Sequence, residues 1–374
     1  MSTSKPVVVY GASGYTGRLI CEYLREFNLP FVAAGRDADR VQSVMDSLPG
    51  IETADYEVAG VEHTAAALTE LFDGAKVVCN TVGPFADLGG EVVEACLASG
   101  CHYVDTTGEQ NWILSSREDF GERFAEAGLL LSAGIAQMYT SGEIAANICL
   151  ETQGVDTLDI LVLWKGAPTT ASTETIFTNL LSEAYFLEQN AYVAWPPPQG
   201  YEVSVPGQHA TALTLPWGGT SHPAWFKDDP RVANVKVLGG VFDRALMEGV
   251  VQIAQMVEEK IKPLPADQQG PALAEVAATM KADMPPRENQ RVNTSIDSVY
   301  ATGPLGNVHC VLRGASNYKQ TGLLQAYAAR CLTLGVTRAV GFGSACQAFG
   351  HRELLGVLQS FGLSGKPAVT SSSV

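Results

Sequence analysis

The stretch that decides the fold spans residues 7–17 and reads Val-Val-Val-Tyr-Gly-Ala-Ser-Gly-Tyr-Thr-Gly. Its first four residues are three β-branched valines and a tyrosine, a run that is typical of a buried parallel strand. Three glycines follow at intervals of three, and apolar residues then recur at helical spacing from Arg18 to Phe27. The stretch therefore predicts a strand, a tight turn and a helix in direct succession.

Each glycine of this turn has a physical task. Gly11 permits the tight turn, Gly14 lets the backbone approach a diphosphate, and Gly17 allows the helix to pack closely on the strand. The first amides of the helix, at the positive end of its dipole, are suited to bind phosphate. A glycine triplet alone is weak evidence, but its strand–turn–helix context favours a dinucleotide site over a mere glycine-rich turn. The candidate cofactor residues here are Gly11, Ser13, Gly14, Tyr15, Thr16 and Gly17.

Strands and helices alternate regularly up to about residue 135. The predicted strands are 31–34, 76–80, 102–105 and 129–132, and the predicted helices are 39–48, 65–72, 90–98 and 118–126. Such alternation is typical of α/β proteins with a doubly wound parallel sheet. We therefore expect a Rossmann domain over residues 1–135.

The pattern changes beyond residue 135. We predict a strand over 157–164, an amphipathic helix over 173–189, two antiparallel strands over 291–302 and 307–313 joined by a turn at 303–306, and helices over 320–334 and 351–361. This predicts a second, α+β domain for substrate binding or dimerisation over 136–318, with a mixed or antiparallel sheet. The helices of 319–365 are expected to return to the Rossmann domain, and the Ser-rich segment 366–374 is expected to be a flexible tail.

Residues after the second strand favour NADP over NAD. Arg36 follows the strand directly and Arg40 comes one helical turn later, and a guanidinium suits a 2′-phosphate. Asp37 has two interpretations, because an acid at this place holds the ribose hydroxyl in NAD sites but also caps helices. We predict NADP(H) as the cofactor.

The segment after the predicted strand 76–80 is a second candidate cofactor contact. Its residues are Asn80, Thr81, Val82, Gly83 and Pro84. In a Rossmann domain the chain passes the nicotinamide-side ribose at this place, and a plain loop turn is the alternative.

Three stretches resemble the saccharopine dehydrogenase-like NADP-binding oxidoreductases, which include trans-acting enoyl reductases. They are VVVYGASGYTGRLI, NTVGPFADLGGEVVEACLASGCHYVDTTGE, and YKQTGLLQAYAARCL followed by FGSACQAFGHRELLGVLQSFGL. The resemblance is close over residues 5–112, moderate over 318–362 and poor between them. It implies a Rossmann lobe that binds NADP and a mixed α/β substrate lobe.

The chain departs from the family after the predicted strand 129–132. Members often carry a Gly-Phe-Asp-Ser-x-Pro-like motif there, whereas residues 133–142 read AGIAQMYTSG, which lacks the acid and introduces Tyr139. Two families that share the opening motif are disfavoured. N-acetylglutamyl-phosphate reductases use a Gly-Cys-Tyr-Pro-Thr segment that is absent here, and short-chain dehydrogenases need a lysine four residues after a tyrosine, which no tyrosine of this chain has.

Hydride transfer also requires a proton donor. Tyr139 and Lys165 are the first candidates, ahead of Glu174, His209 and His222. Each has a structural alternative: Tyr139 is a helix-start aromatic, Lys165 a solvated strand end, and Glu174 an acid favoured by the helix dipole. Asp105 and Glu109 are better suited to order the cleft than to donate protons. The candidate substrate contacts are Phe85, Glu109 and Glu174.

Scarce cations limit the substrate class. From residue 108 to 230 the chain has only Arg117, Arg123, Lys165 and Lys227, whereas a dicarboxylic amino acid needs several cations to neutralise it. The same span is rich in aromatic residues: Trp112, Trp164, Phe177, Tyr185, Phe186, Tyr192, Trp195, Trp217, Trp225 and Phe226. We predict reduction of a hydrophobic enone or ketone, and a conjugated C=C bond is the preferred site of reduction. An imine or secondary-amine dehydrogenase is the second hypothesis, and a non-catalytic NADP-binding sensor the third.

Composition constrains partners and compartment. The 374-residue chain has a formal charge of −16, which repels phosphate and disfavours nucleic acids and anionic membranes. Its eight cysteines show no C-x-x-C pair and no metal-ligand spacing, which is typical of a reducing compartment. We expect no signal peptide and no membrane-spanning stretch. We therefore expect a cytoplasmic protein that binds a small-molecule substrate and no metal ion, with a homodimer through the strands of the second domain as a further hypothesis.

Overall fold

The glycine turn follows an interior strand of a seven-stranded sheet in the computed structural model, which describes residues 5–216, 221–278 and 284–373. The strand order is β15-β6-β5-β4-β1-β2-β3, and every pairing is parallel. The strands are β1 (Val7–Tyr10), β2 (Phe31–Gly35), β3 (Tyr56–Gly60), β4 (Val77–Asn80), β5 (His102–Asp105), β6 (Leu130–Ser132) and β15 (Gly341–Phe342). The predicted α/β class with a doubly wound parallel sheet is confirmed.

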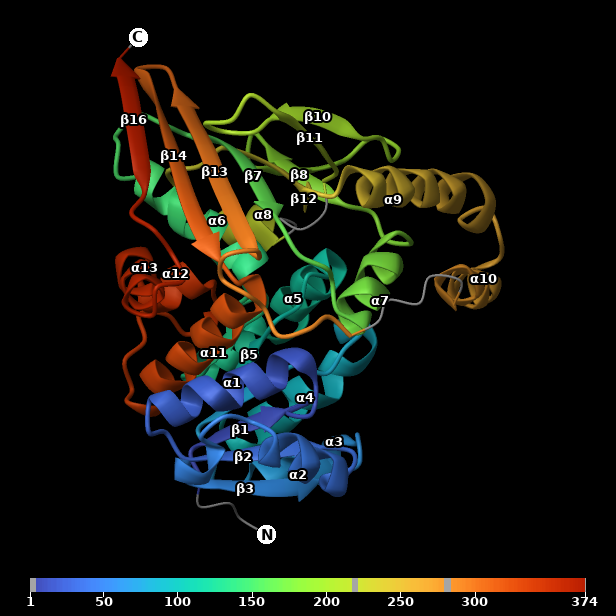
Figure 1. Ribbon diagram of the computed structural model, residues 1–374, viewed down its shortest axis with the longest axis vertical. Coiled ribbons are helices and arrows are strands. Elements are labelled where there is room, and N and C mark those ends of the chain that lie inside the picture. Colours follow the sequence, from blue (N-terminus) through green and yellow to red (C-terminus); the bar gives the residue numbers. More distant parts are fainter. Residues whose placement is uncertain (1–4, 217–220, 279–283, 374) are drawn as a thin grey trace. The chain divides into compact units, whose positions relative to one another are not determined.

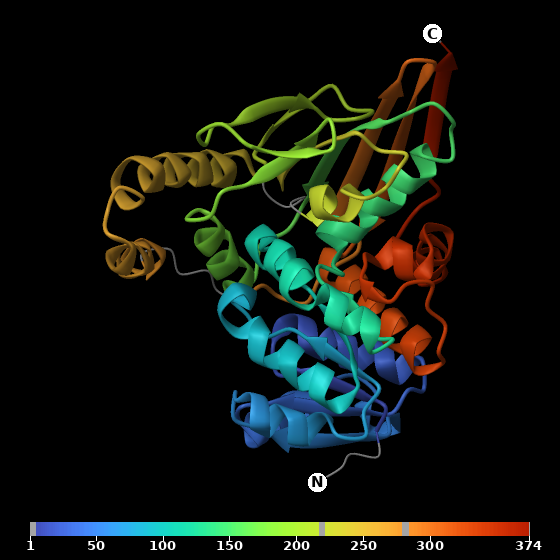
Figure 2. The ribbon, with the colours of Figure 1, turned by 180° about the vertical axis from the view of Figure 1, so that it is seen from behind.

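The chain divides into two compact units. Unit 1 comprises residues 1–107, 112–140 and 318–361, and unit 2 comprises residues 108–111, 141–317 and 362–374. Figures 1 and 2 show the elements of both units from opposite sides. The helices that belong wholly or largely to unit 1 are α1 (Tyr15–Glu26), α2 (Ala38–Asp46), α3 (Ala65–Phe72), α4 (Phe85–Ser99), α5 (Gln110–Glu126), α11 (Asn317–Thr333), α12 (Ala345–Phe349) and α13 (His351–Ser360), with a short 3₁₀ turn η1 (Ile51–Thr53).

Two of these helices begin earlier than predicted. α4 begins at Phe85 rather than at residue 90, and the reason is packing: a Cβ on Gly89 would lie 2.5 Å from Cζ2 of Trp112. α5 begins at Gln110 rather than at 118. Its serines fit within the helix because the hydroxyl of Ser116 donates to the carbonyl of Ile113 at 3.1 Å.

The C-terminal helix α11 packs directly on α1. A Cβ on Gly322 would lie 2.8 Å from Cβ of Leu19, so only a glycine allows this approach. Tyr318 lies edge-on to Tyr15 with ring centroids 5.0 Å apart. The starts of the two helices therefore lie together, and residues 318–361 contribute to the structure that carries the glycine turn.

Unit 2 is built on a second seven-stranded sheet, of order β16-β14-β13-β7-β12-β8-β9. Only β7 and β12 pair in parallel, and the other pairs are antiparallel, so the predicted mixed sheet is confirmed. The strands are β7 (Thr157–Trp164), β8 (Tyr185–Glu188), β9 (Ala191–Ala194), β12 (Asn234–Val241), β13 (Thr294–Gly303), β14 (Gly306–Ala315) and β16 (Ala368–Ser373).

Two predictions in this region are wrong. The expected helix over 173–189 is a shorter helix, α7 (Thr170–Asn179), followed by strand β8, because residues 185–188 pair with β9 through a tight turn at Gln189 and Asn190. The expected flexible tail over 366–374 contains β16 over its described residues, in antiparallel register with β14 from Val311↔Ala368 to Gly306↔Ser373. The Ser-rich composition conceals this strand, since backbone pairing with a sheet edge needs no particular side chains.

Further elements complete unit 2. α6 (Gln137–Cys149) begins in unit 1 and continues into unit 2, and β10 (Tyr201–Ser204) and β11 (Thr211–Thr214) form a small antiparallel pair. The remaining elements are α8 (Ser221–Phe226), α9 (Arg244–Met256), a π-helical turn η2 (Val257–Ile261) and α10 (Ala266–Ala278). Trp217, one of the aromatics singled out above, lies outside the described residues. Across the described ranges, the helices are all too short or too polar to cross a membrane.

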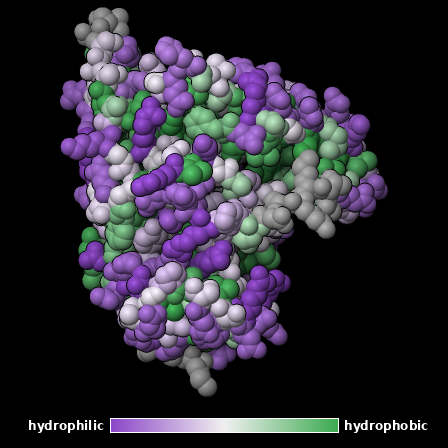
Figure 3. Space-filling model, viewed as in Figure 1, coloured by the Kyte–Doolittle hydropathy of each residue, from purple (hydrophilic) through white to green (hydrophobic). Residues whose placement is uncertain are grey.

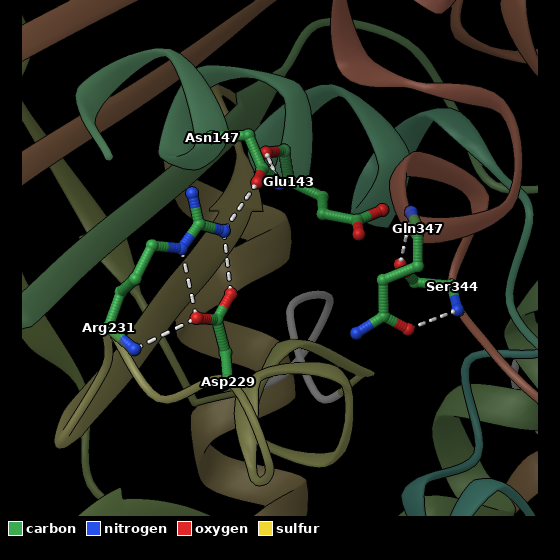
Figure 4. A network of polar contacts seen from close by, with 6 residues as sticks. All are labelled: Glu143, Asn147, Asp229, Arg231, Ser344 and Gln347. Carbon is green, nitrogen blue, oxygen red and sulfur yellow. Dashed lines mark hydrogen bonds and ion pairs between the residues drawn. The ribbon is translucent and has the colours of Figure 1, made fainter. Parts of the chain in front are cut away.

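Polar side chains fix loops in both units (Figure 4). In unit 2, Arg231 holds the carboxylate of Asp229 at 2.7 Å and donates to Oδ1 of Asn147 on α6 at 3.2 Å. Burial alone raises the pKa of Asp229, but the hydrogen bonds and charge of Arg231 outweigh it and hold that pKa below its usual value. In unit 1, Ser344 and Gln347 form a capping box at the start of α12.

Candidate dinucleotide-binding site

The glycine turn excludes side chains by close backbone contacts. Gly11 has a φ of +91°, and a Cβ there would lie 2.5 Å from Oγ1 of Thr81. A Cβ on Gly17 would lie 2.3 Å from the carbonyl oxygen of Gly11, and one on Gly14 would lie 3.2 Å from the same oxygen. The turn can keep this shape only with glycines at the first and last of these positions.

The helix that follows begins without a side-chain cap. The N-cap of α1 is Gly14, and no side chain caps it. The first helical hydrogen bond runs from the amide of Arg18 to the carbonyl of Gly14 at 3.1 Å, so the amides of residues 15–17 precede the helical ladder. By contrast, α2 is capped by Asp37 and α3 by Thr64. The start of α1 therefore fits an anionic ligand such as a diphosphate.

The strand order places this turn where a dinucleotide binds. β1 lies between β2 and β4, and the chain builds the sheet outward from β1 in both directions. In such sheets, ligands bind in the crevice outside the carboxyl ends of the strands at this reversal. Thr81, directly after β4, donates its amide and its hydroxyl to the carbonyl of Tyr10, at 2.9 and 3.0 Å. The two predicted cofactor segments thus meet at the same edge.

The residues after β2 fit a 2′-phosphate. Arg36 is exposed, and its positive charge acts on Tyr10, whose pKa burial raises and Arg36 lowers in part. Oδ1 of Asp37 accepts from the amide of Arg40 at 3.0 Å, so the capping interpretation of Asp37 is confirmed. The hydroxyl of Tyr10 lies 2.9 Å from Nδ1 of His63, which follows β3. The guanidinium of Arg36 is therefore exposed to solvent, whereas the carboxylate of Asp37 caps α2.

A buried carboxylate orders the same edge of the sheet. Asp105, fully buried at the end of β5, accepts four hydrogen bonds. Its Oδ2 accepts from the hydroxyl of Tyr103 at 2.8 Å and from the indole of Trp112 at 3.0 Å. Its Oδ1 accepts from the amides of Thr107 at 3.0 Å and Gly134 at 2.8 Å. Burial raises the pKa of Asp105 above its usual value, although these donors lower it in part.

The network continues to the predicted nicotinamide-side segment. The side-chain amide of Asn80 donates to the hydroxyl of Tyr103 at 3.1 Å, and Oδ1 of Asn80 accepts from the amide of Val82 at 2.9 Å. The chain of contacts from Asp105 through Tyr103 and Asn80 thus fixes the backbone ahead of the cis bond between Gly83 and Pro84. Asp105 is therefore a positioning residue for this segment.

Sequence reasoning missed one member of this network. Gln325, on α11, donates its side-chain amide to the carbonyls of Asp105 at 2.6 Å and Ile135 at 2.9 Å. Asn80 and Asp105 could have been paired in advance, because they end neighbouring parallel strands in register. Nothing in the sequence pattern connects Gln325 to these strands, since 220 positions separate it from Asp105.

The other predicted site residues lie in varied surroundings. Tyr139 lies in the part of α6 that belongs to unit 1 and is 8% exposed, and Phe85 packs in the core of unit 1. In unit 2, Lys165 is exposed just after β7, Glu174 is exposed on α7, and Glu109 is fully buried. Neither unit by itself contains both proposed proton donors. Of the two histidines, His209 is exposed and His222 is buried in α8.

Comparisons with known proteins agree with the geometry of this edge. Residues 7–130 match the family model of the saccharopine dehydrogenase NADP binding domain, and residues 140–373 match that of the family of unknown function DUF5938. The predicted resemblance is confirmed for the first of these segments, which is an NADP-binding domain. The prediction of NADP(H) as the cofactor is confirmed with it.

Three curated relatives each match about a third of the chain. The chain is 35% identical over 131 residues to a lipid droplet localized protein of Caenorhabditis elegans. It is 32% identical over 132 residues to a trans-acting enoyl reductase of Mycobacterium ulcerans, and 30% identical over 139 residues to a saccharopine dehydrogenase-like oxidoreductase of Homo sapiens. The matches cover 33%, 34% and 33% of this chain and 31%, 32% and 32% of those proteins, respectively. The chain thus matches about a third of the length of these relatives.

Proposed function

We propose that this chain, which belongs to the family of unknown function DUF5938 and carries a saccharopine dehydrogenase-type NADP-binding domain, is an NADPH-dependent oxidoreductase. Its preferred reaction is the reduction of a conjugated carbon–carbon double bond in a hydrophobic, weakly charged molecule. The observation that carries the proposal is the uncapped start of α1 behind a turn that only glycines can form, with an exposed Arg36 after the next strand.

The residues of unit 1 have distinct parts in this proposal. The amides after Gly14 bind the diphosphate, Arg36 binds the 2′-phosphate, and the segment from Asn80 to Pro84 borders the nicotinamide-side ribose. When bound, NADPH supplies a hydride, which in an enone is accepted by the β-carbon. The protein then has to deliver a proton to the α-carbon.

Side chains outside the cofactor segments complete the proposed reaction. We assign proton delivery to Tyr139 or Lys165, both of which carry a transferable proton. We assign substrate contacts to Phe85, Glu109 and Glu174. Asp105 takes no part in proton transfer, because all four of its hydrogen bonds hold neighbouring groups in place.

Two observations support a hydrophobic substrate. Residues 108–230 contain only four lysines and arginines, too few to neutralise a dicarboxylic amino acid. One relative is named a trans-acting enoyl reductase and another a lipid droplet localized protein. The saccharopine dehydrogenase-like relative favours a second candidate, oxidation or reduction at a carbon–nitrogen bond. A third candidate is an NADP-binding sensor without turnover.

Compartment and assembly belong to the same proposal. The cysteines are all free and buried, as suits a reducing compartment such as the cytoplasm. β9 and β16 are the outer strands of the unit 2 sheet, and pairing of such an edge with a second copy would make a homodimer. Sedimentation equilibrium would measure the assembly, and a monomer at all concentrations would contradict the homodimer.

The test is binding and oxidation of NADPH across a panel of enones, ketones and imines. We expect NADPH to bind more tightly than NADH and to be oxidised most rapidly with enones. Tyr139→Phe and Lys165→Ala should slow turnover while leaving NADPH affinity unchanged. If neither variant slows reduction, the donor assignment is wrong. NADPH binding without oxidation by any member of the panel would support the sensor instead.

A further inference from the structure

Unit 2 contains a pocket of about 330 Å³ that the proposed function has not used so far. It lies among α7, the end of β9, the end of β11, α9 and η2. Its volume is at the lower end of the range for small-molecule sites. The apolar side chains that line it include Ile176, Leu180, Trp195, Leu215, Val250 and Ala254.

The aromatic wall of the pocket is held in place by its neighbours. The ring of Trp195 lies 4.9 Å from that of Phe186 and 5.9 Å from that of Tyr201, measured between centroids. The amide of Trp195 donates to the carbonyl of Ala184 at 2.8 Å. Trp195 therefore offers a large, oriented apolar surface to a ligand, with little side-chain freedom left to lose on binding.

A second wall comes from the segment that follows β5 in the chain. Gln110 lines the pocket and is 4% exposed. Its side-chain oxygen accepts from the amide of Tyr185 at 2.6 Å, and its side-chain nitrogen donates to the carbonyl of Tyr185 at 3.0 Å. Asn179, also in the lining, donates to the carbonyl of Gly108 at 3.0 Å. In the sequence, four residues separate Gln110 from Asp105.

The charged part of the pocket is neutralised internally. Nζ of Lys262 lies 2.7 Å from Oε2 of Glu258, and both line the pocket. The helix changes to a π turn here, with the amide of Lys262 bonded to the carbonyl of Val257, and such turns are frequent at functional sites. Glu183, a second acid of the lining, accepts from the hydroxyl of Tyr185. Among the described residues of the lining, the only cation is Lys262, which is already paired, and two acids lie nearby, so an anionic ligand would lack compensation for its charge.

We propose that this pocket binds the apolar part of the substrate, and that the ligand it selects is neutral: an alkyl chain or ring that carries a carbonyl or hydroxyl group. This inference deepens the proposed function and rests on it. The carbonyl of such a ligand can accept hydrogen bonds from the polar lining, and its hydrocarbon part covers Trp195 and the aliphatic side chains. In Figure 3, hydrophobic surface shows around α9.

The test uses the full-length protein without NADPH, so that no turnover occurs. Calorimetric titration compares decan-2-one with decanoate, which matches it in length but is an anion. We expect the ketone to bind at least about tenfold more tightly, because the paired Lys262 leaves the carboxylate without compensation. Equal or tighter binding of decanoate would overturn the proposal.

Two variants on the same stretch of helix locate the binding. Val250→Trp places a bulky ring in the pocket and should weaken ketone binding about tenfold or more. The matched control is Leu246→Trp, also on α9 but 40% exposed and outside the lining, which should leave the affinity within about twofold. Unchanged ketone affinity in Val250→Trp would overturn the proposal.

A charge variant gives a result that misfolding cannot imitate. Glu258→Gln frees Lys262 and should raise the affinity for decanoate about tenfold while leaving that for decan-2-one unchanged. Glu248→Gln, which removes an exposed acid paired with Arg244 elsewhere on α9, is the control and should change neither affinity. No gain for decanoate in Glu258→Gln would contradict the assignment of the charged wall.

NADPH affinity, measured in every preparation, separates this proposal from the proposed function. If NADPH binds and the ketone does not, the pocket assignment fails and the oxidoreductase assignment stands. If the ketone binds and NADPH does not, the oxidoreductase assignment fails instead.

Discussion

The glycine turn of unit 1 and the pocket of unit 2 are built in opposite ways. The turn is made of backbone. It has no room for side chains, because a Cβ on Gly17 would lie 2.3 Å from the carbonyl oxygen of Gly11 and a Cβ on Gly11 would lie 2.5 Å from Oγ1 of Thr81. The pocket is made of side chains from several elements that are far apart in the chain. A backbone site requires particular residues at fixed spacing, whereas a side-chain site accepts many residues of similar size and polarity. The first kind can be recognised in a sequence, and the second can be recognised only in a structure.

The two regions also treat charge differently. Asp105 is fully buried with four donors, so its environment is rigid and specific. Glu258 and Lys262 keep 36% and 27% of their side chains exposed, so their pairing can adapt to a ligand. We therefore expect changes in unit 1 to alter NADPH binding strongly and changes in unit 2 to alter the choice of substrate.

The largest effect is expected from Asp105→Asn. The new amide group would face two donors in place of one carboxylate oxygen, which should lower the free energy of unfolding by about 4 kcal/mol at neutral pH. Urea unfolding followed by tryptophan fluorescence measures this, since Trp112 donates to Asp105. The control is Asp119→Asn, which changes an exposed acid on α5 and should shift stability by less than about 0.5 kcal/mol.

The pH dependence of the stability of Asp105→Asn, compared with the wild type, tests whether the pKa of Asp105 is raised. Burial raises the pKa of Asp105 above its usual value of 3.8, so the folded state retains a proton that the unfolded chain releases. The contribution of Asp105 to stability is complete at pH values below its pKa in the unfolded chain. This contribution declines as the pH rises through its pKa in the folded protein. The advantage of the wild type over Asp105→Asn should therefore be larger at low pH. An advantage that grows with rising pH would contradict the raised pKa.

The next largest effect is expected from Gly17→Ala. The added Cβ would meet the backbone of Gly11 and Ala12, which cannot yield as a side chain can. We expect NADPH affinity to fall about a hundredfold, or by about 3 kcal/mol, with ketone binding to unit 2 unchanged. Gly90→Ala is the matched control, because a Cβ there has no described atom within 4 Å and should stabilise α4 by about 0.5–1 kcal/mol. NADPH binding as tight as in the wild type would show that the turn does not hold the cofactor.

Arg36→Ala should have a smaller and more selective effect. Loss of the guanidinium should weaken NADPH about thirtyfold, or by about 2 kcal/mol, and leave NADH almost unchanged. The control Arg123→Ala removes an exposed arginine that pairs with Glu94 and should affect neither cofactor. An equal loss for both cofactors would mean that Arg36 does not read the 2′-phosphate.

The smallest effect is expected from Asp37→Ala. Removal of the cap should destabilise α2 by about 1 kcal/mol without changing the preference for NADPH over NADH. Asp37→Ser, which retains a capping oxygen, should restore most of the lost stability. Thermal unfolding and the two cofactor affinities measure both effects. A change of cofactor preference in Asp37→Ala would show that this acid also contacts the ribose.

The Rossmann sheet could be predicted because its signals are local. β1, β2, β4, β5 and β6 are short apolar runs between helices, and their order follows from the rules for parallel crossovers. The tail could not, because β16 is stabilised by backbone bonds to β14, more than fifty positions earlier in the chain. The expected helix over 173–189 failed for the same reason, since residues 185–188 are held by β9 and β12.

For the site, the sequence by itself determined the glycine turn, and it led to the proposals that this turn binds a diphosphate and that Arg36 binds the 2′-phosphate. These depend on residues that are close in the chain, where backbone geometry permits few alternatives. Only the tertiary structure decided that Gln325 supports Asp105, that Asp37 is a cap, and that the Glu258–Lys262 pair and Trp195 form one pocket. Those arrangements depend on which distant segments pack together, and packing is set by the sum of many weak contacts rather than by any short pattern.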